Sequence, residues 1–174
     1  MSETAQISHE VKPTGRIAFT IDTALLLLRV VPFGLLTVHG AQKLFGVWGG
    51  KGLSGTASGF AAMGYEPAWF FALLGGGAEF VGGILLFLGL FTPLGAAMSL
   101  GVMINAVAAV AAKGLESSGY AIVLAVIAAA LAISGPGRFS LDAGRPWHRT
   151  GPVVAAVSIA VAVATSAATL LVKG

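Results

Sequence analysis

The chain contains no cysteine and very few charged residues, and each absence narrows what the protein can be. Without cysteine there is no disulfide, no thiol redox chemistry and no thiolate metal site. Only 10% of the 174 residues are charged, whereas soluble domains carry about 25%. With 56% hydrophobic residues and a mean hydropathy of +0.91, a small soluble fold could not keep its apolar surface out of water. We therefore expect an all-α, polytopic transmembrane helical bundle with no separate soluble domain.

Long apolar runs occur in five places. About 20 apolar residues cross the hydrocarbon core, and long runs without polar alternation are helices rather than barrel strands. The predicted spans are 17–41, 69–90, 94–112, 119–134 and 152–172. We expect a polar N-terminal tail over residues 1–16 and a four-helix membrane domain over 17–142. Residues 143–174 add a basic loop and a fifth transmembrane helix.

A loop rich in Gly and Ser, residues 44–68, joins the first two spans. Ser54 is positioned to cap a short helix within it, because Ser is a favoured N-cap residue. Trp48, Tyr65 and Trp69 suit the aromatic belt at a membrane interface. Two interpretations stay open for this loop: an interfacial flap lying on the membrane surface, or a plain connection.

The positive charges favour one orientation in the membrane. Lys and Arg are enriched in cytoplasmic loops. Five spans place the tail, the turn at 91–93 and the loop at 135–150 on one side, with five cations against four on the other. Three of the five are arginines in one loop: Arg138, Arg145 and Arg149. We expect a multi-pass inner-membrane protein with a cytoplasmic N-terminus. The net charge of +3 bears on orientation and lipid contact, not on nucleic-acid binding.

Polar residues within the spans form the candidate site, because ionisable groups at membrane depth are rare and usually face the bundle interior. Arg29, Glu79 and Asn105 fall near the centres of the first three spans. Spans one and two run antiparallel, so we expect Arg29 and Glu79 to meet at the same depth as an ion pair. Pairing offsets much of the cost of burying either charge.

The predicted pair extends into a longer polar track. His39 and Lys43 share a helix face, and Lys43 lies about four turns from Arg29. The track consists of Asn105, Glu79, Arg29, His39, Gln42 and Lys43. Three interpretations are open: a site for a quinone-like or lipid head group, a proton path, or a structural ion pair with His39 and Lys43 reaching the headgroups.

Small residues recur at helical spacing in three spans, the second, the third (Ala97, Gly101, Ala109, with Asn105) and the fifth. Close helix contacts in membranes favour such residues. In the second span Gly75, Gly82 and Gly89 repeat every seven residues around Glu79, which predicts a groove for one neighbouring helix. In the fifth span the predicted packing ridge is Ala156, Ala160, Ala164 and Ala168.

No catalytic or metal-binding residue is assigned from the sequence. His9 and His148 lie outside the spans, so no pair of haem ligands exists within the membrane. No carboxylate–histidine cluster suggests a metal. No resident cofactor is evident, and a quinone is the one redox ligand that the polar track suits.

Three blocks of sequence, taken in order, resemble the DoxX family. They are Arg29 with His39-Gly40-Ala41-Gln42-Lys43, then Ala78-Glu79-Phe80-Val81-Gly82-Gly83 continuing to Thr92-Pro93, and then Gly135-Pro136-Gly137-Arg138-Phe139-Ser140-Leu141-Asp142. The similarity covers roughly residues 20–142. It implies a four-helix inner-membrane bundle, with the fifth span outside the common core. It also implies that Arg29, His39, Lys43 and Glu79 occupy the family's recurrent polar positions.

The resemblance also carries expectations about function. Members of the wider family are associated with membrane oxidoreductase systems, including the small subunit of a thiosulfate:quinone oxidoreductase, and with redox-stress complexes. We therefore expect an accessory subunit that contacts quinone or lipid at an Arg29–Glu79 site and does not catalyse redox chemistry alone. The expected partners are the lipid bilayer and a membrane or membrane-associated redox enzyme, with a homo-oligomer left open. The alternatives are a small-solute or lipid carrier using the same track, and a scaffold with a structural ion pair.

Overall fold

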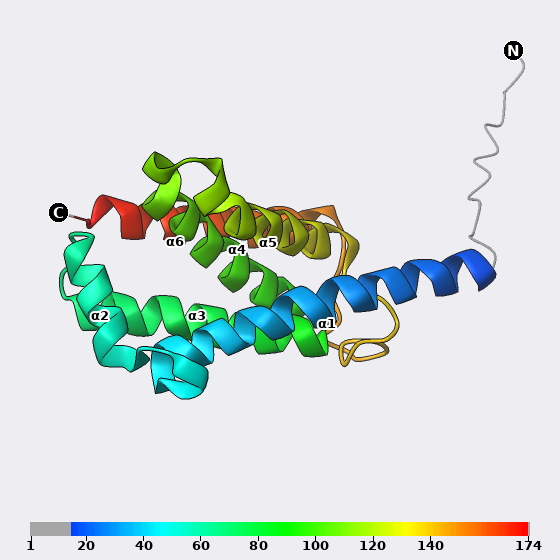
Figure 1. The fold of residues 1–174 in the computed structure, drawn as a ribbon. Helices are drawn as coiled ribbons and strands as arrows, with labels where there is room; N and C mark the ends of the chain where they lie inside the picture. The colour runs from blue at the N-terminus through cyan, green and yellow to red at the C-terminus, as the bar shows by residue number, and fades with distance from the viewer. Residues whose placement is uncertain (1–14, 174) are drawn as a thin grey trace, which may run out of the picture.

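The computed structural model describes residues 15–173, which form a helical bundle (Figure 1). Within that range five helices are long and apolar enough to cross a membrane. They are α1 (Gly15–Phe45), α3 (Ala68–Leu88), α4 (Thr92–Val110), α5 (Leu115–Ser134) and α6 (Pro152–Leu171). The predicted fold class is confirmed, and no helix end lies more than four residues from its predicted position. Of the predicted tail, residues 1–14 lie outside the described residues, and Gly15 and Arg16 already belong to α1.

Three short elements complete the chain. A 3-10 turn, η1 (Val47–Gly49), and the helix α2 (Gly52–Ala62) follow α1, and a second 3-10 turn, η2 (Ala111–Lys113), follows α4. The short helix expected within residues 44–68 is therefore present, although it begins at Gly52 rather than after Ser54. It packs on α3 and α1, at the end of the bundle where the C-terminus also lies (Figure 1).

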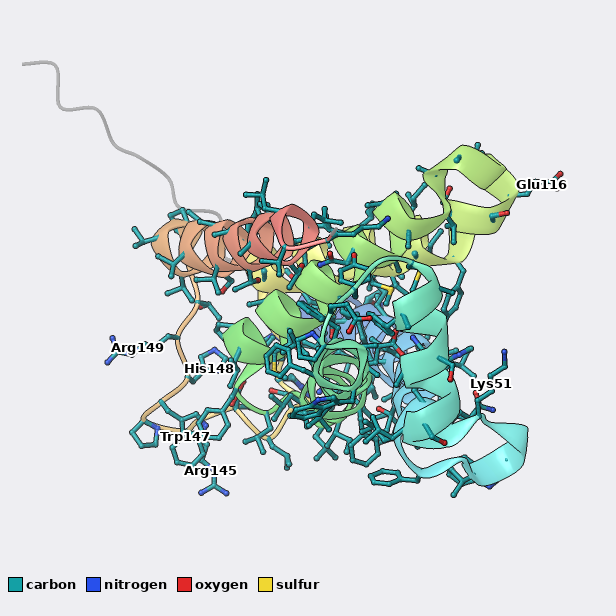
Figure 2. The ribbon with its side chains drawn as sticks, turned by 90° about the vertical axis from the view of Figure 1, so that its left-hand side faces the viewer. Lys51, Glu116, Arg145, Trp147, His148 and Arg149 are labelled. Carbon is teal, nitrogen blue, oxygen red and sulfur yellow. The ribbon has the colours of Figure 1, made fainter. Side chains whose placement is uncertain are left out.

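The helix α4 lies at the centre of the bundle. It packs on α3 on one side and on α5 and α6 on the other, while α1 packs mainly on α3 (Figures 1 and 2). Large buried side chains from α1, α3, α4 and α5 form the main core: Phe33, Leu36, Leu86, Leu100, Met103, Leu124 and Leu131. Each of these four helices therefore has one face committed to the interior.

Two glycines set the register between α1 and α3. A Cβ on Gly40 would lie 2.4 Å from the backbone nitrogen of Phe80, and a Cβ on Gly83 would lie 2.9 Å from the backbone nitrogen of Thr37. No side chain fits in either place, so the two backbones are in direct contact, as small-residue interfaces in membranes allow. Gly40 therefore lies opposite Phe80, and Thr37 opposite Gly83.

This arrangement contradicts the groove predicted along Gly75, Gly82 and Gly89. The three glycines face three different elements: Gly75 meets Phe60 of α2, Gly82 meets α4, and Gly89 meets Arg29 of α1. The prediction assumed a single neighbouring helix, but α3 is surrounded by α1, α2 and α4.

The alanine ridge predicted on α6 is also on the wrong face. Its four alanines are exposed, and the buried residues are Ala155, Ser158, Ala162 and Ser166. Ser166 favours this orientation because its hydroxyl has a partner on another helix, whereas the Ser158 hydroxyl bonds within α6. Ser158 donates to the carbonyl of Val154, and Ser166 accepts a hydrogen bond from Asn105 of α4.

The N-terminal half of α1 extends beyond the rest of the bundle (Figure 1). Within residues 15–28 of α1 no residue is buried. The loop between α5 and α6 packs along this segment: the backbone N–H of Arg138 donates to Asp22 at 2.9 Å, and the Phe19 and Phe139 rings meet edge to face with centroids 5.8 Å apart. The segment is therefore held by a loop rather than by another helix.

We expect Gly40→Ala to destabilise the bundle by about 1–3 kcal/mol, because the added methyl group would force the α1 and α3 backbones apart. Thermal unfolding in detergent measures the effect. The matched control is Gly77→Ala in α3, where a Cβ meets nothing within 4 Å and no loss is expected. Equal melting temperatures for Gly40→Ala and the wild type would contradict the close contact.

Candidate functional site

A cavity of about 1080 Å³ lies among α1, α2, α3, α4 and α6. Its volume is at the upper end of the range for small-molecule sites, about 300–1,000 Å³. Five of the six predicted site residues line it: His39, Gln42, Lys43, Glu79 and Asn105. Most of the remaining wall is apolar, with Phe60, Met63, Phe70, Leu74, Met98, Val102 and Val161 among its side chains.

An ion pair between Lys43 of α1 and Glu79 of α3 forms the charged part of the cavity wall. The Lys43 ammonium donates a hydrogen bond to Oε1 of Glu79. Glu79 is 3% exposed, and its second oxygen, Oε2, has no hydrogen-bond partner among the described residues. The Lys43 side chain is 38% exposed, so its ammonium keeps donors that a bound molecule can reach.

Arg29 lies at the opposite end of the bundle from this pair, and the predicted Arg29–Glu79 ion pair is wrong. The Arg29 guanidinium is buried and donates to the backbone carbonyls of Phe139 and Phe87. The physical reason is the α1–α3 register, which brings Lys43 rather than Arg29 to the level of Glu79. Fourteen residues separate the two cations on α1, about 21 Å along a helix.

The pocket around Arg29 is built from backbone. A Cβ on Gly89 would lie 1.9 Å from Nη1 of Arg29, so only glycine leaves room for the guanidinium. Gly89 also has φ +62°, a conformation that glycine adopts without the steric cost other residues bear. The carboxylate of Asp142 adds electrostatic stabilisation to the buried cation. Arg29 thereby links α1 to the end of α3 and to the loop after α5.

Asp142 closes the same end of the bundle by capping α4. Its carboxylate accepts hydrogen bonds from the backbone N–H groups of Phe91 and Thr92, each at 2.9 Å, from the Thr92 hydroxyl and from the Trp147 indole. Burial alone would raise the pKa of this carboxyl. The hydrogen bonds from Thr92, Phe91 and Trp147 outweigh burial, so the pKa lies below the ordinary value of an aspartate.

Asn105 joins α4 to α6 at the wall of the cavity. Its amide nitrogen donates to the Ser166 hydroxyl at 2.8 Å and to the Gly101 carbonyl at 3.1 Å, and its oxygen accepts from the Thr169 hydroxyl at 2.9 Å. The amide is thus committed to helix packing. In membranes such interhelical hydrogen bonds contribute about 0.6–2 kcal/mol each.

His39 and Gln42 flank the ion pair on α1. The His39 ring lies 5.5 Å from the Tyr120 ring of α5, centroid to centroid. Gln42 donates to the carbonyl of Trp48 at 3.2 Å, and a Cβ on Gly50 would lie 2.3 Å from the Gln42 carbonyl oxygen. These contacts hold the chain where it turns from α1 into η1, beside Lys43.

Several polar residues of the structure were missed in the sequence. Tyr65, predicted in an interfacial belt, is 4% exposed and packs between Phe60 and Phe71 at the cavity wall. Ser166 and Thr169 are polar residues three apart in an apolar span, a spacing that places both on one face. Asp142 is the last residue of the third stretch that resembles the DoxX family, but nothing in the sequence indicated that it caps α4.

The helices and the cavity define a class: a polytopic helical membrane protein with a half-buried ion pair in the wall of a cavity. The chain belongs to the DoxX family, whose model matches residues 24–112, just over half of the chain. The match runs from within α1 to the end of α4, and α5 and α6 lie outside it. Neither the curated proteins nor the solved structures contain a match.

We expect Lys43→Met to lower stability by about 2–3 kcal/mol, because it leaves the Glu79 carboxylate buried without a counter-charge. Lys43 is partly exposed, which keeps the effect below that of a fully buried pair. The double variant Lys43→Met/Glu79→Gln should recover most of the loss in a thermal unfolding assay. A double variant as unstable as the single one would argue against the pair.

We expect Asp142→Asn to lower stability by about 2–4 kcal/mol at neutral pH, because the amide group would face hydrogen-bond donors. The folded-state pKa of Asp142 is depressed, so its contribution is present above the unfolded pKa, about 3.9, and is lost as the pH falls through the folded pKa. The melting-temperature difference between wild type and variant should therefore stay constant from pH 7 to about pH 5 and shrink below about pH 4.

The control for this series is Asp22→Asn, which weakens one backbone hydrogen bond and a 3.7 Å ion pair with Arg138. It should cost less than about 1 kcal/mol. A difference for Asp142→Asn that does not change between pH 7 and pH 3 would contradict the role of its charge.

Proposed function

We propose that this chain is an accessory subunit of a membrane oxidoreductase system and that it binds a quinone in the cavity beside Lys43 and Glu79. The observation that carries the proposal is the cavity itself, which combines a mostly apolar wall with one charged pair. Ligand sites of this kind use apolar walls for affinity and a few polar groups for orientation. The proposed binding site therefore lies at the Lys43–Glu79 pair and not at the Arg29–Glu79 pair that the sequence predicted.

A quinone matches the distribution of groups around the cavity. The Lys43 ammonium is a donor for a quinone carbonyl, and aromatic and aliphatic side chains such as Phe60, Phe70 and Leu74 offer contact to the ring and tail. Membership of the DoxX family adds the association with oxidoreductase systems that the resemblance implies. Because the chain has no cysteine and its sequence offers no evident set of cofactor ligands, we assign electron transfer to a partner enzyme.

We place the protein in the inner membrane with its N-terminus in the cytoplasm. The loop between α5 and α6 lies at the same end of the bundle as the start of α1 (Figure 1). In Figure 2 Arg145 and Arg149 of this loop point away from the bundle, where they can meet anionic headgroups. The cavity and α2 then lie toward the opposite, outer side.

The same cavity supports a second candidate, a carrier for lipids or small solutes. The specific observation is the breadth of the wall, which draws on five helices and exceeds what one head group needs. A carrier moves its substrate when reconstituted alone in vesicles, whereas an accessory subunit does not. That assay separates the two functions.

Mild extraction from native membranes tests the proposal, with bound quinone measured by mass spectrometry and partner proteins identified. The wild type should carry quinone and a redox enzyme. Gly77→Phe should lose most of the bound quinone, because position 77 lines the cavity, a Cβ there meets nothing within 4 Å, and the ring would take up space in the cavity. The matched control is Gly119→Phe in α5, also open but away from the cavity, which should keep its quinone. Wild-type protein that carries neither quinone nor a redox enzyme would overturn the proposal.

A further inference from the structure

The cavity meets the outer surface of the bundle between α3 and α6. A side chain that is both on the cavity wall and exposed lies at an edge of the cavity. Six large apolar side chains of the wall are between 44% and 54% exposed: Phe70, Leu73, Leu74 and Val81 of α3, Leu94 of α4 and Val161 of α6. We call the gap that these six residues line the lateral opening.

The lateral opening exists because α3 and α6 both pack on α4, whereas little contact joins them directly. The residues of α4 that line the cavity run from Leu94 to Val110, about 24 Å along a helix. Small side chains form much of this floor: Ala97, Gly101, Ala106 and Ala109. All three helices are long and apolar enough to span the membrane, so the lateral opening follows most of the roughly 30 Å hydrocarbon core.

A smaller hollow of about 350 Å³ adjoins the cavity between the start of α3 and the end of α6. It shares Phe70, Phe71, Leu74 and Thr169 with the cavity, and Ala168 adds to its α6 side. The lateral opening therefore continues along both helices toward the end of the bundle that holds the C-terminus.

The walls of the lateral opening are almost without charge. Apart from Glu79, which pairs with Lys43, no charged residue of α3, α4 or α6 lines the cavity in the part of the chain that the structure describes. Two hydroxyls of α6 on this side are bonded within the protein: Thr165 donates to the Val161 carbonyl at 2.8 Å, and Thr169 donates to Asn105 at 2.9 Å. Only apolar surface is thus offered to a molecule that passes between α3 and α6.

The cavity has a second exposed edge, where α1 ends and α2 begins, and this edge is polar. His39 and Lys51 line the cavity there and are exposed. The two edges favour different visitors, because acyl chains surround the membrane spans, whereas polar groups favour the headgroup region and water.

We propose that ligands enter the cavity sideways from the bilayer, through the lateral opening, and that they are lipid-soluble molecules rather than solutes taken from water. An apolar chain crosses uncharged walls without losing hydrogen bonds, whereas a water-soluble solute would give up its hydration there. The inference rests on the proposed function, since a quinone is such a lipid-soluble molecule, and adds the route and the solubility class to it. For the carrier alternative it retains lipids and excludes small solutes.

Fluorescence quenching tests whether acyl chains reach the cavity. The chain has no cysteine, so a single introduced cysteine carries one bimane label. Met98→Cys places the label on the cavity floor, on the central helix α4. In proteoliposomes, lipids brominated along their acyl chains should quench this label. Failure of brominated lipid to quench position 98 would overturn the lateral opening, whatever aqueous iodide does.

Two further labels provide the references for quenching. Val126→Cys lies on α5, is 63% exposed and does not line the cavity, so it reports direct contact with lipid. Arg149→Cys lies in the loop between α5 and α6 and points away from the bundle (Figure 2), so it reports contact with water. The label at position 98 should resemble the one at 126 and lose little fluorescence to iodide.

A cross-link across the smaller hollow tests the route. Leu74→Cys and Ala168→Cys place one thiol on each side of it, and both positions are exposed. The double variant is loaded with deuterated decylubiquinone in proteoliposomes, bridged with a short bismaleimide and chased with unlabelled decylubiquinone. Bridging should stop the exchange measured by mass spectrometry. The matched controls are the two single-cysteine variants treated with the same reagent, which should keep exchanging.

The outcomes separate this inference from the proposed function. A bridged protein that exchanges decylubiquinone as fast as the single variants would overturn the lateral route, while quinone binding stands. If the wild type binds no decylubiquinone, the proposed function fails. The quenching result then decides the route alone, because an acyl chain that reaches position 98 has passed between α3 and α6.

Discussion

The direct contact between α1 and α3 determines where Arg29, Lys43 and Glu79 lie relative to one another. Gly40 against Phe80 and Gly83 against Thr37 leave no room for a side chain, so the two helices lock in one register. That register brings Lys43 to Glu79 and carries Arg29 about four turns away to the end of α3. A shift of one turn would leave a buried carboxylate and a buried guanidinium without their partners, at a cost of several kcal/mol.

The bundle therefore has two separate charged sites, one around Arg29 and Asp142 and one around Lys43 and Glu79. At one end Arg29 is held by the carbonyls of Phe87 and Phe139, while Asp142 caps α4, so α1, α3, α4 and the loop after α5 are joined there. Nε of Arg29 is buried without a hydrogen-bond partner among the described residues. At the other end Glu79 pairs with Lys43 in the wall of a cavity, and its Oε2 is buried without a hydrogen-bond partner among the described residues.

The cavity depends on helices inside and outside the region that the family model matches. Residues 24–112 supply the ion pair, α2 and Asn105. The remaining wall comes from α6, through Val161, Thr165, Ser166 and Thr169. The Asn105–Ser166 hydrogen bond attaches α6 to α4, so the closure of the cavity relies on a helix outside the matched region. Substitutions on this face of α6 are therefore a route by which ligand preference changes while the ion pair is kept.

The sequence alone determined the membrane class and the five spans, and five of the six site residues that it suggested line the cavity, because hydropathy and helical spacing are local properties. It placed Lys43 and Glu79 in one track but paired Glu79 with Arg29, since matching span centres ignores the register. The glycines that fix the register are visible in the sequence, but α3 carries glycines toward three neighbours, and only the tertiary packing shows which of them face α1. Asp142 caps α4 from a position fifty residues away in the chain. On α6, Ser166 is buried and the predicted alanine ridge is not. Both features follow from long-range packing, which no local pattern encodes.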